Sequence, residues 1–450
     1  MRLSARACLL STHTFEEPME AETQDSSPSE AKPTGSASVG EPQGLFSSFS
    51  EHQFRWLFAS NSTFFLALTG QQVLRSWLVF QITGNARSLG LISAMVAIPM
   101  LLIAPIGGVV ADRVDRRTLV AAGQAVTVVA ESVILWLLIS GSLEYWHLLV
   151  SAAVLGATFP FIMPARQAII ANSVGRQRLT NAMALNMAAV NTTRVVGPAV
   201  AGFLIGTTGA GFAYGLNVAL FFIALTCMLG VGPAPPAKGT VEASPRRNLR
   251  AGFDYIRSDS LVFVLLFFGL VPMFLVMPFQ NLLVVFAEDV WQVGALGFGF
   301  LNAASGTGGL VGAILVAWHS KAPGRLRTMM VSVFAFGLFL VLFAISPWYL
   351  LALPMVFIAS AFANLYSTLN NTAIQVLIPN EVRGRVSSFL MMSFSLPLLG
   401  TLPVSALADA VGAPIAISVA SALAVVIAIA FYAWSPPLRS MDERIREALS

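Results

Sequence analysis

The chain is dominated by long apolar runs, each about as long as a helix needs to cross a bilayer. A membrane-spanning helix requires roughly 20 consecutive, mostly apolar residues. The sequence contains twelve such runs, six on each side of a polar stretch at 232–259. Only 11% of the residues are charged and 56% are hydrophobic, whereas about 25% are charged in an average soluble domain. These runs predict an all-α membrane protein with 12 transmembrane helices in two six-helix halves.

The same runs define the expected organisation of the chain. The spans lie near 55–82, 88–110, 117–140, 146–166, 181–207, 211–231, 260–286, 294–318, 327–346, 348–372, 386–408 and 413–434. They form an N-terminal six-helix bundle at 54–231 and a C-terminal six-helix bundle at 260–434, joined by a central cytoplasmic loop at 232–259. The acidic segment 1–53 is rich in Ser, Glu, Pro and Gly, so we expect a disordered cytoplasmic tail. Residues 435–450 form a second, short tail.

Basic residues alternate from one loop to the next. The central loop and loops 2–3, 4–5, 8–9 and 10–11 hold sixteen Lys and Arg residues, whereas the opposite loops hold only Arg87. This count places Arg166 in the loop that follows the fourth span. Because loops rich in Lys and Arg stay on the cytoplasmic side, we expect a protein of the inner (cytoplasmic) cell membrane with both termini in the cytoplasm.

Three landmarks recur in the two halves at a similar spacing. The matching pairs are Leu89-Gly90 with Leu296-Gly297, Ala168-Ile169 with Ala373-Ile374, and Pro198 with Pro403. These matches predict a duplicated six-helix unit. Internal repeats around a site at the membrane midplane are a transporter architecture.

Composition excludes several other classes of protein. Two cysteines cannot form a disulfide framework, and the four histidines lack metal-ligand spacing. No Gly-Lys-Ser/Thr phosphate loop is present, so the chain carries no Walker-type ATPase. We expect no catalytic residues, no metal and no cofactor. We also expect no nucleic-acid partner. The arginines that raise the pI to about 9.3 lie beside the membrane spans, where the orientation of the chain in the membrane explains them.

The residues after the second span carry a recognisable signature, Gly108-Val-Val-Ala-Asp112-Arg113-Val-Asp115-Arg116-Arg117. It resembles the loop 2–3 signature of the major facilitator superfamily, with Asp115 in place of the usual glycine. The resemblance implies a conformational lock in which Asp112 faces the start of span 11 near 386–388. The lock residues would be Gly108, Asp112, Arg113, Arg116 and Arg117. Plain topology is the alternative, because the arginines alone would hold the loop inside.

Span 5 contains a run similar to the Gly-Pro-x-x-Gly-Gly motif of proton-coupled antiporters, which reads Gly197-Pro198-Ala-Val-Ala-Gly202. Two further stretches narrow the resemblance, Trp77-Leu-Val and Pro164-Ala-Arg166-Gln167. Together they resemble the branch that holds the bacterial enterobactin exporter and macrolide-efflux proteins. The resemblance covers about residues 54–434 and implies export of a small molecule by alternating access.

Only three ionisable side chains lie well inside the expected spans: Arg75, Glu131 and Arg194. Each costs a few kcal/mol at the centre of a membrane helix, so each should face a partner or a water-filled cavity. Glu131 is the only carboxylate among them and hence the best candidate for a proton carrier. A static pair between Glu131 and an arginine fits the sequence equally well. Arg194 resembles the family's span 5 arginine and would meet an anionic or carbonyl-rich substrate, with snorkelling or helix-to-helix hydrogen bonding as the alternative.

Polar residues share helix faces with these charges. At 3.6 residues per turn, the polar residues of spans 1, 3, 5 and 10 each gather on one side of their helix. We expect these sides to line one central, partly aqueous substrate cavity. Its residues would be Asn61, Gln72, Arg75, Gln124, Asn186, Asn191, Arg194, Asn364 and Asn371.

The pattern as a whole favours a secondary active transporter and not an enzyme. We expect a monomer in the lipid bilayer that couples inward proton flow to efflux of a small amphipathic molecule, such as a siderophore, a macrolide or another drug. Uptake or lysophospholipid transport stays open, because one fold serves several functions. A membrane-embedded lipid or prenyl transferase is disfavoured, because the carboxylates cluster nowhere beyond Asp112 and Asp115.

Overall fold

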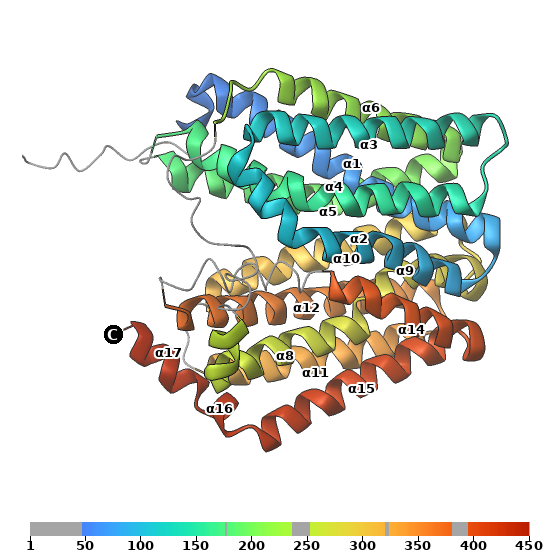
Figure 1. Ribbon diagram of the computed structural model, residues 1–450. Helices are drawn as coiled ribbons and strands as arrows, with labels where there is room; N and C mark the ends of the chain where they lie inside the picture. Colours follow the sequence, from blue (N-terminus) through green and yellow to red (C-terminus); the bar gives the residue numbers. More distant parts are fainter. Residues whose placement is uncertain (1–46, 176–177, 236–252, 320–323, 380–394, 450) are drawn as a thin grey trace, which may run out of the picture. The chain divides into compact units, whose positions relative to one another are not determined.

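The expected spans coincide with helices in the computed structural model, which describes residues 47–175, 178–235, 253–319, 324–379 and 395–449 (Figure 1). The first half consists of α1 (His52–Thr83), α2 (Ala86–Arg113), α3 (Arg116–Ile139), α4 (Tyr145–Ser173), α5 (Leu179–Thr208) and α6 (Ala210–Leu229). The second half consists of α8 (Ser260–Val276), α9 (Phe279–Val285), the π-helical turn η3 (Phe286–Val290), α10 (Gly294–His319), α11 (Arg325–Ala344), α12 (Tyr349–Leu377), α14 (Leu396–Val411) and α15 (Ala413–Trp434). Within the described ranges, ten helical stretches are long and apolar enough to cross a membrane, and α1 and the shorter α14 complete the expected set.

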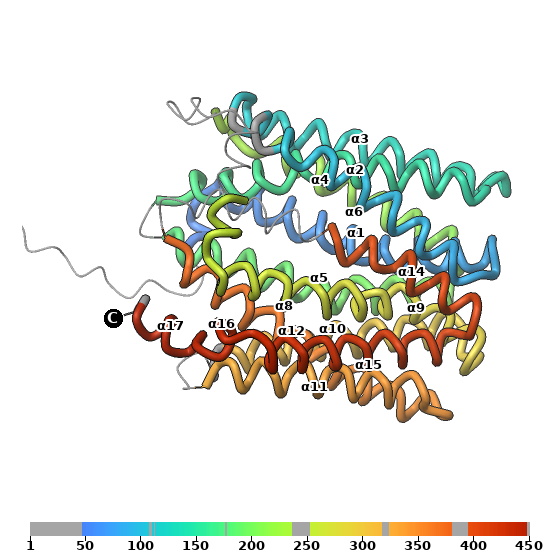
Figure 2. Tube along the Cα trace, turned by 60° about the horizontal axis from the view of Figure 1, so that its bottom comes forward, coloured from blue at the N-terminus to red at the C-terminus, as the bar shows by residue number. Residues whose placement is uncertain are grey.

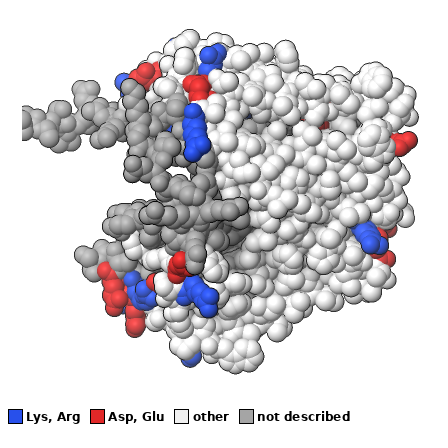
Figure 3. All heavy atoms as spheres, in the orientation of Figure 1, with Lys and Arg blue, Asp and Glu red and all other residues white. Residues whose placement is uncertain are grey.

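The outer surface of the helices suits lipid rather than water. Figure 3 shows charged side chains gathered toward the ends of the helices, with a broad uncharged band between them on this face. Large apolar side chains such as Val129, Trp136 and Phe203 are exposed. Contiguous apolar surface of this kind is stable when hydrocarbon surrounds it.

The same five helix pairs pack together in each half. In the first half α1 contacts α5 and α6, α2 contacts α4, and α3 contacts α4 and α6. In the second half α8 contacts α14 and α15, α10 contacts α12, and α11 contacts α12 and α15. When α8, α9 and η3 are taken as one span, each second-half pair lies six spans after its counterpart. This pairing is the one that a duplicated six-helix unit predicts.

The halves meet along two further helix pairs, α2 with α14 and α5 with α10 (Figure 2). Glycines permit the close approach. Gly202 of α5 lies against the backbone of Gly299 in α10, and Gly90 of α2 lies against the backbone of α14 at Leu402. A Cβ atom at Gly202 or Gly90 would overlap that backbone, so small residues set the distance between the halves.

One expected boundary is wrong, and one expected span contains a break. The fourth span, expected to end at Arg166, continues as α4 to Ser173, because Ile169 and Ile170 extend its buried apolar face. Arg166 therefore lies inside a helix and not in a loop. The seventh expected span is interrupted at Met277 and Pro278. Proline has no backbone N–H to donate, so the helix ends there and restarts as α9.

The C-terminal segment folds onto the second half as α16 (Pro436–Arg439) and α17 (Met441–Leu449). Met441 and Ile445 are buried. The Arg444 guanidinium pairs with Asp259, the N-cap of α8, at 3.0 Å, and Asp442 accepts a hydrogen bond from the backbone N–H of Leu326 at 3.2 Å. The expected disorder of the acidic tail concerns residues that lie mainly outside the described part, which begins with η1 (Ser47–Ser50).

Candidate translocation site

A buried ion pair occupies the interior of the first half. Arg75 of α1 and Glu131 of α3 lie 3.0 Å apart, and Glu131 is only 1% exposed. Ser151 of α4 donates to the same carboxylate oxygen at 2.7 Å, and Tyr214 of α6 donates its hydroxyl to the other oxygen. Four helices therefore converge on one carboxylate, and the second half contributes nothing to it among the described contacts.

This geometry links the protonation of Glu131 to the position of Arg75. A buried carboxylate is tolerated when a cation and hydrogen bonds compensate it, and a buried guanidinium needs an anion in the same way. Binding a proton at Glu131 would remove the charge that neutralises Arg75. The cluster can therefore hold the helices together as an ion pair, or exchange a proton if the pair separates.

The polar stripe of α3 points into the same interior. Gln124 and Thr127 are as deeply buried as Glu131, and Gln124 donates to Ser60 of α1 at 3.5 Å. The helix that carries these side chains, α3, packs on α4 and α6 of the first half. Arg75 and Gln124 thus lie within the first half in the described conformation.

Along one face of α5, the side chains are buried near the end of the helix and exposed near its beginning. Ala201 and Ile205 are 5% and 7% exposed, whereas Met183 and Met187 are 41% and 62% exposed. All four lie within about 40° of one another around the helix, together with the exposed Arg194. This face is therefore covered toward the end of α5 and open toward its beginning.

The open face of α5 points toward the space between the halves. On one side of it, Gly197 contacts α1, and on the other side Gly202 contacts α10. Gln72 of α1 is exposed between two buried neighbours, and Asn191 of α5 is half-buried. On α12, Asn364 and Asn371 are half-buried, and Asn364 lies beside Gly309 of α10.

The end of the bundle where α1 ends and α2 begins, called here the far end, is closed by contacts between the halves. The backbone N–H of Ala86, the first residue of α2, donates to the Asp409 carboxylate of α14 at 2.8 Å. Gln81 of α1 lies 3.5 Å from the Glu288 carboxylate. Trp77 stacks on Phe298 of α10, with ring centroids 6.2 Å apart.

Asn61 and Asn186 join a second buried charge. The Asn61 amide donates to the Asn186 side chain at 2.9 Å, and the Arg166 guanidinium donates to the Asn61 side-chain oxygen. Asn61 and Arg166 are each 2% exposed. The sequence places Asn61 and Asn186 on polar faces, but nothing in it signals that Arg166 is their partner.

The loop 2–3 signature is partly helical. Arg113 is the exposed last residue of α2, and Asp115 is the N-cap of α3. Arg116 begins α3, and its backbone N–H donates to the carbonyl of Ala234, while the Arg117 guanidinium donates to the carbonyl of Leu229. The side-chain surroundings of Gly108 and Asp112, and the proposed partner segment at 386–388, lie outside the described residues. The lock remains a prediction.

The span 5 motif sits where α5 meets both neighbours. Gly197 packs against the backbone of α1 at Leu66, Gly202 packs against Gly299 of α10, and Pro198 lies between them within α5. Thr69 of α1 donates to the carbonyl of Thr193, one turn before Gly197, at 2.8 Å. The motif therefore brings α5 into close contact with its own half and with the other.

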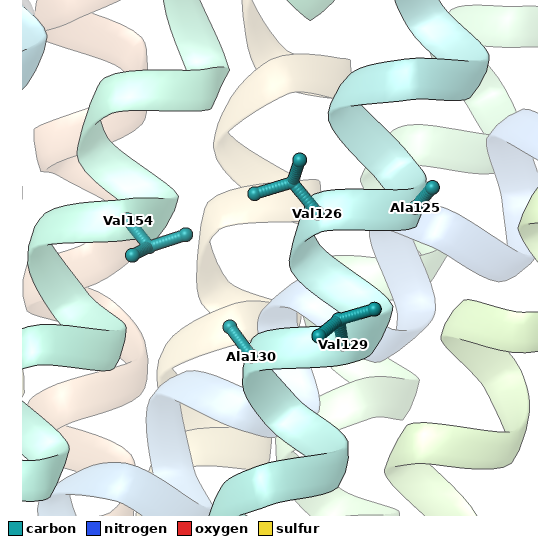
Figure 4. Close-up of a pocket in the computed structure, with 5 residues that line it drawn as sticks. All are labelled: Ala125, Val126, Val129, Ala130 and Val154. Atoms are coloured by element: carbon teal, nitrogen blue, oxygen red, sulfur yellow. The ribbon is translucent and has the colours of Figure 1, made fainter.

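An apolar groove of about 420 Å³ lies on the outside of the first half (Figure 4). Its lining comes from α3 (Ala125, Val126, Val129 and Ala130) and from Val154 of α4. Because Val126 and Val129 are exposed on the uncharged outer face, this groove faces lipid and lies away from the polar faces described above.

Several site residues escape sequence analysis. Ser151 and Tyr214 complete the Glu131 cluster, yet both lie in long, mostly apolar runs where neither stands out by charge. Tyr214 and the buried Asn217 are three residues apart on α6, which is the one periodic signal that marks this face. In the described part of the chain, no three His, Cys, Asp or Glu side chains group as a metal site would require.

Comparisons with known proteins agree with this architecture. The chain matches the transmembrane secretion effector family model over residues 43–449. It is 32% identical over 217 residues to the enterobactin exporter EntS of Shigella boydii serotype 18 (strain CDC 3083-94 / BS512). This alignment covers 48% of this chain and 51% of that protein. It is 27% identical over 329 residues to EntS of Shigella boydii serotype 4 (strain Sb227), covering 69% of this chain and 72% of that protein. The first of these alignments thus spans about half the length of the relative.

A solved structure shares the fold. A variant of the nucleoside transporter NupG superposes with a TM-score of 0.71 at 15% identity, covering 85% of this chain and 99% of that one. At this identity the likeness concerns the fold alone.

Proposed function

The chain belongs to the transmembrane secretion effector family of the major facilitator superfamily, and on that premise we propose that it exports a small amphipathic molecule in exchange for protons. It is a multi-pass membrane transporter and not an enzyme. The names of its relatives support export, since they are enterobactin exporters. Siderophores, macrolides and other drugs are the proposed substrate classes.

The buried cluster around Glu131 carries the proton-coupling part of the proposal. The carboxylate is enclosed by Arg75, Ser151 and Tyr214 at the junction of four helices. A proton that reaches Glu131 leaves Arg75 without its counter-ion, and the cluster must then rearrange. Such a rearrangement would move helices that also carry the polar faces of the first half.

The proposed path follows the open face of α5. With both termini in the cytoplasm, the exposed end of that face opens to the cytoplasm and the far end faces outward. Gln72, Asn191 and Arg194 would meet the substrate from the first half, and Asn364 and Asn371 from the second. Opening the far end requires separation of Asp409 from α2, and the Asp112 lock would then close the cytoplasmic end.

Substrate retention in efflux-deficient bacterial cells tests this proposal. Cells would express the wild type, Glu131→Gln, Arg194→Ala or Glu144→Gln, and retention of a siderophore, a macrolide and a cationic dye would be compared with and without a protonophore. Glu144→Gln is the matched control, because it makes the same chemical change at an exposed site. We expect the wild type and the control to lower retention of one compound, and the protonophore and Glu131→Gln to abolish this effect.

Two outcomes would contradict the proposal. Normal export by Glu131→Gln would make the Arg75–Glu131 pair a static one and would move the coupling site elsewhere. Higher retention in cells with the wild type than in empty cells would reverse the direction and favour uptake.

A further inference from the structure

Arg166 is a buried cation outside the Glu131 cluster. It lies within α4, is 2% exposed, and its guanidinium carbon sits 4.2 Å from the centre of the Phe64 ring. One terminal nitrogen, Nη1, donates to Asn61, and Asn61 in turn donates to Asn186 of α5. The side chain is thus the inner end of a polar chain that begins near the open face of α5.

No described residue accepts a hydrogen bond from the other edge of this guanidinium. Its Nε and Nη2 atoms are buried and make no hydrogen bond with any described residue. Other arginines of the described chain pair with carboxylates: Arg75 with Glu131, Arg178 with Glu51 and Arg444 with Asp259. Arg166 has an amide and an aromatic ring instead of an acid.

The Nε–H and Nη2–H donors of Arg166 lie side by side and could bind a ligand together. Nε–H and the neighbouring Nη2–H of an arginine point in parallel and match the two oxygens of a carboxylate. A buried cation and two buried donors without acceptors each cost free energy, so a fold keeps such a group when a ligand uses it in some state. A planar anion with two oxygens is the ligand that fits this edge.

We propose that Arg166 is an anion-binding residue of the translocation path, and that its Nε/Nη2 edge takes a carboxylate-type group of the transported molecule. Asn186 and Arg194 are eight residues apart on α5, or about 12 Å. Because α5 is open at its beginning, Asn186 and with it Arg166 lie nearer the open end than Arg194 does. Arg166 would therefore meet the anion first, between α1, α4 and α5, and Arg194 would meet it farther along α5. This inference rests on the proposed function and narrows its substrate class to anions. Because the Nε and Nη2 atoms are buried in the described conformation, binding requires neighbouring side chains to move.

Thermal unfolding of the detergent-purified full-length chain tests this proposal without transport or a proton gradient. The probes are benzoate and its neutral isostere benzamide. We expect benzoate, and not benzamide, to raise the unfolding temperature of the wild type. Arg178→Met, which removes an arginine from an exposed ion pair, should keep the response to benzoate.

Two substitutions of Arg166 separate ligand binding from a structural role. Arg166→Met should abolish the benzoate response and leave the ligand-free unfolding temperature unchanged or higher, because an unpaired buried charge is replaced by an apolar chain of similar length. Arg166→Lys keeps the charge but loses the two-pronged edge, so the apparent affinity for benzoate should fall about ten- to a hundredfold.

The contrary results are equally distinct. A wild type that does not respond to benzoate, a response that persists in Arg166→Met, or a lower ligand-free unfolding temperature in Arg166→Met would each overturn the proposal. Failure of Glu131→Gln to block export would leave it untouched, because the binding assay involves no proton transfer.

Discussion

At the scale of single residues, Asp115 shows how this chain departs from the superfamily signature without losing the turn. Its φ of −55° needs no glycine. Its carboxylate accepts hydrogen bonds from the backbone N–H and the hydroxyl of Thr118, both at 2.9 Å, and from the backbone N–H of Ala234 at 2.8 Å. Burial raises the pKa of Asp115, but these bonds and the charge of Arg117 outweigh it and hold the pKa below 3.8.

Asp115→Ala should therefore lower the stability of the fold by about 1 kcal/mol at pH 7, because α3 loses its N-cap. A carboxyl whose pKa is lower in the folded state contributes stability above its unfolded pKa, and this contribution is lost as the pH falls through the folded value. The difference from the wild type should thus shrink as the pH falls below 3.8. Unfolding midpoints in detergent at neutral and acidic pH measure this difference in stability.

Asp115→Asn should lose less stability than Asp115→Ala, because Asn also caps helices. An Asp115→Ala variant as stable as the wild type at pH 7 would contradict the account.

The buried charged residues can be identified from the sequence more readily than the residues that contact them. Arg75, Glu131 and Arg194 stand out because charge is rare in apolar runs, and the structure places Arg75 beside Glu131. The sequence alone does not identify Ser151 or Tyr214 as partners of Glu131, since contacts between helices depend on how the helices are rotated about their axes. Arg166 escapes because a span boundary seven residues too early puts it in a loop.

At the scale of helices, glycine contacts decide which faces can approach. Gly308 and Gly312 of α10 are four residues apart, in GxxxG spacing, and meet the backbone of α12 at Phe357 and Ala361. Gly202 and Gly299 do the same between α5 and α10, across the two halves. The sequence gives the GxxxG spacing, but it does not tell which neighbour each glycine faces.

Gly202→Val should impair the contact between α5 and α10. The added side chain meets the backbone of Gly299, so the helices must separate or the far end must stay open. We expect substrate retention to rise to the level of empty cells and the unfolding temperature to fall. Gly211→Val on α6 is the matched control, because a Cβ there meets nothing within 4 Å. Equal behaviour of the two variants would show that the close contact has no role.

At the scale of the whole molecule, the two halves repeat one arrangement and meet along α2 with α14 and α5 with α10. The apolar runs and the alternating basic loops predict the helices and their number, because membrane thickness fixes span length. They do not predict which end is closed. That depends on contacts such as Asp409 with the first residue of α2, which are specific to one conformation.

Asp409→Ala should shift the population toward an open far end. The change removes an acceptor and a negative charge from the N-terminus of α2, and a hydrogen bond of this kind is worth about 1.5–3 kcal/mol. In a background without Cys8 and Cys227, Ser405→Cys at the α2–α14 contact reports opening through its rate of maleimide labelling. We expect labelling to be at least about tenfold faster with Asp409→Ala.

A cysteine at exposed Ser142 provides the control, and its labelling rate should not change. Unchanged labelling at Ser405→Cys would mean that Asp409 does not hold the far end closed.

The most direct test of proton-coupled export is the collapse of a pH gradient in inside-out membrane vesicles. Respiration acidifies the vesicle interior, and an acridine dye reports the gradient while a siderophore, a macrolide and a carboxylated dye are added in turn. The account predicts that one compound dissipates the gradient in vesicles that carry the wild type or Glu144→Gln, and that Glu131→Gln abolishes this effect. Transport of a compound into wild-type vesicles without any change in the gradient would contradict it, and so would an equal collapse with Glu131→Gln.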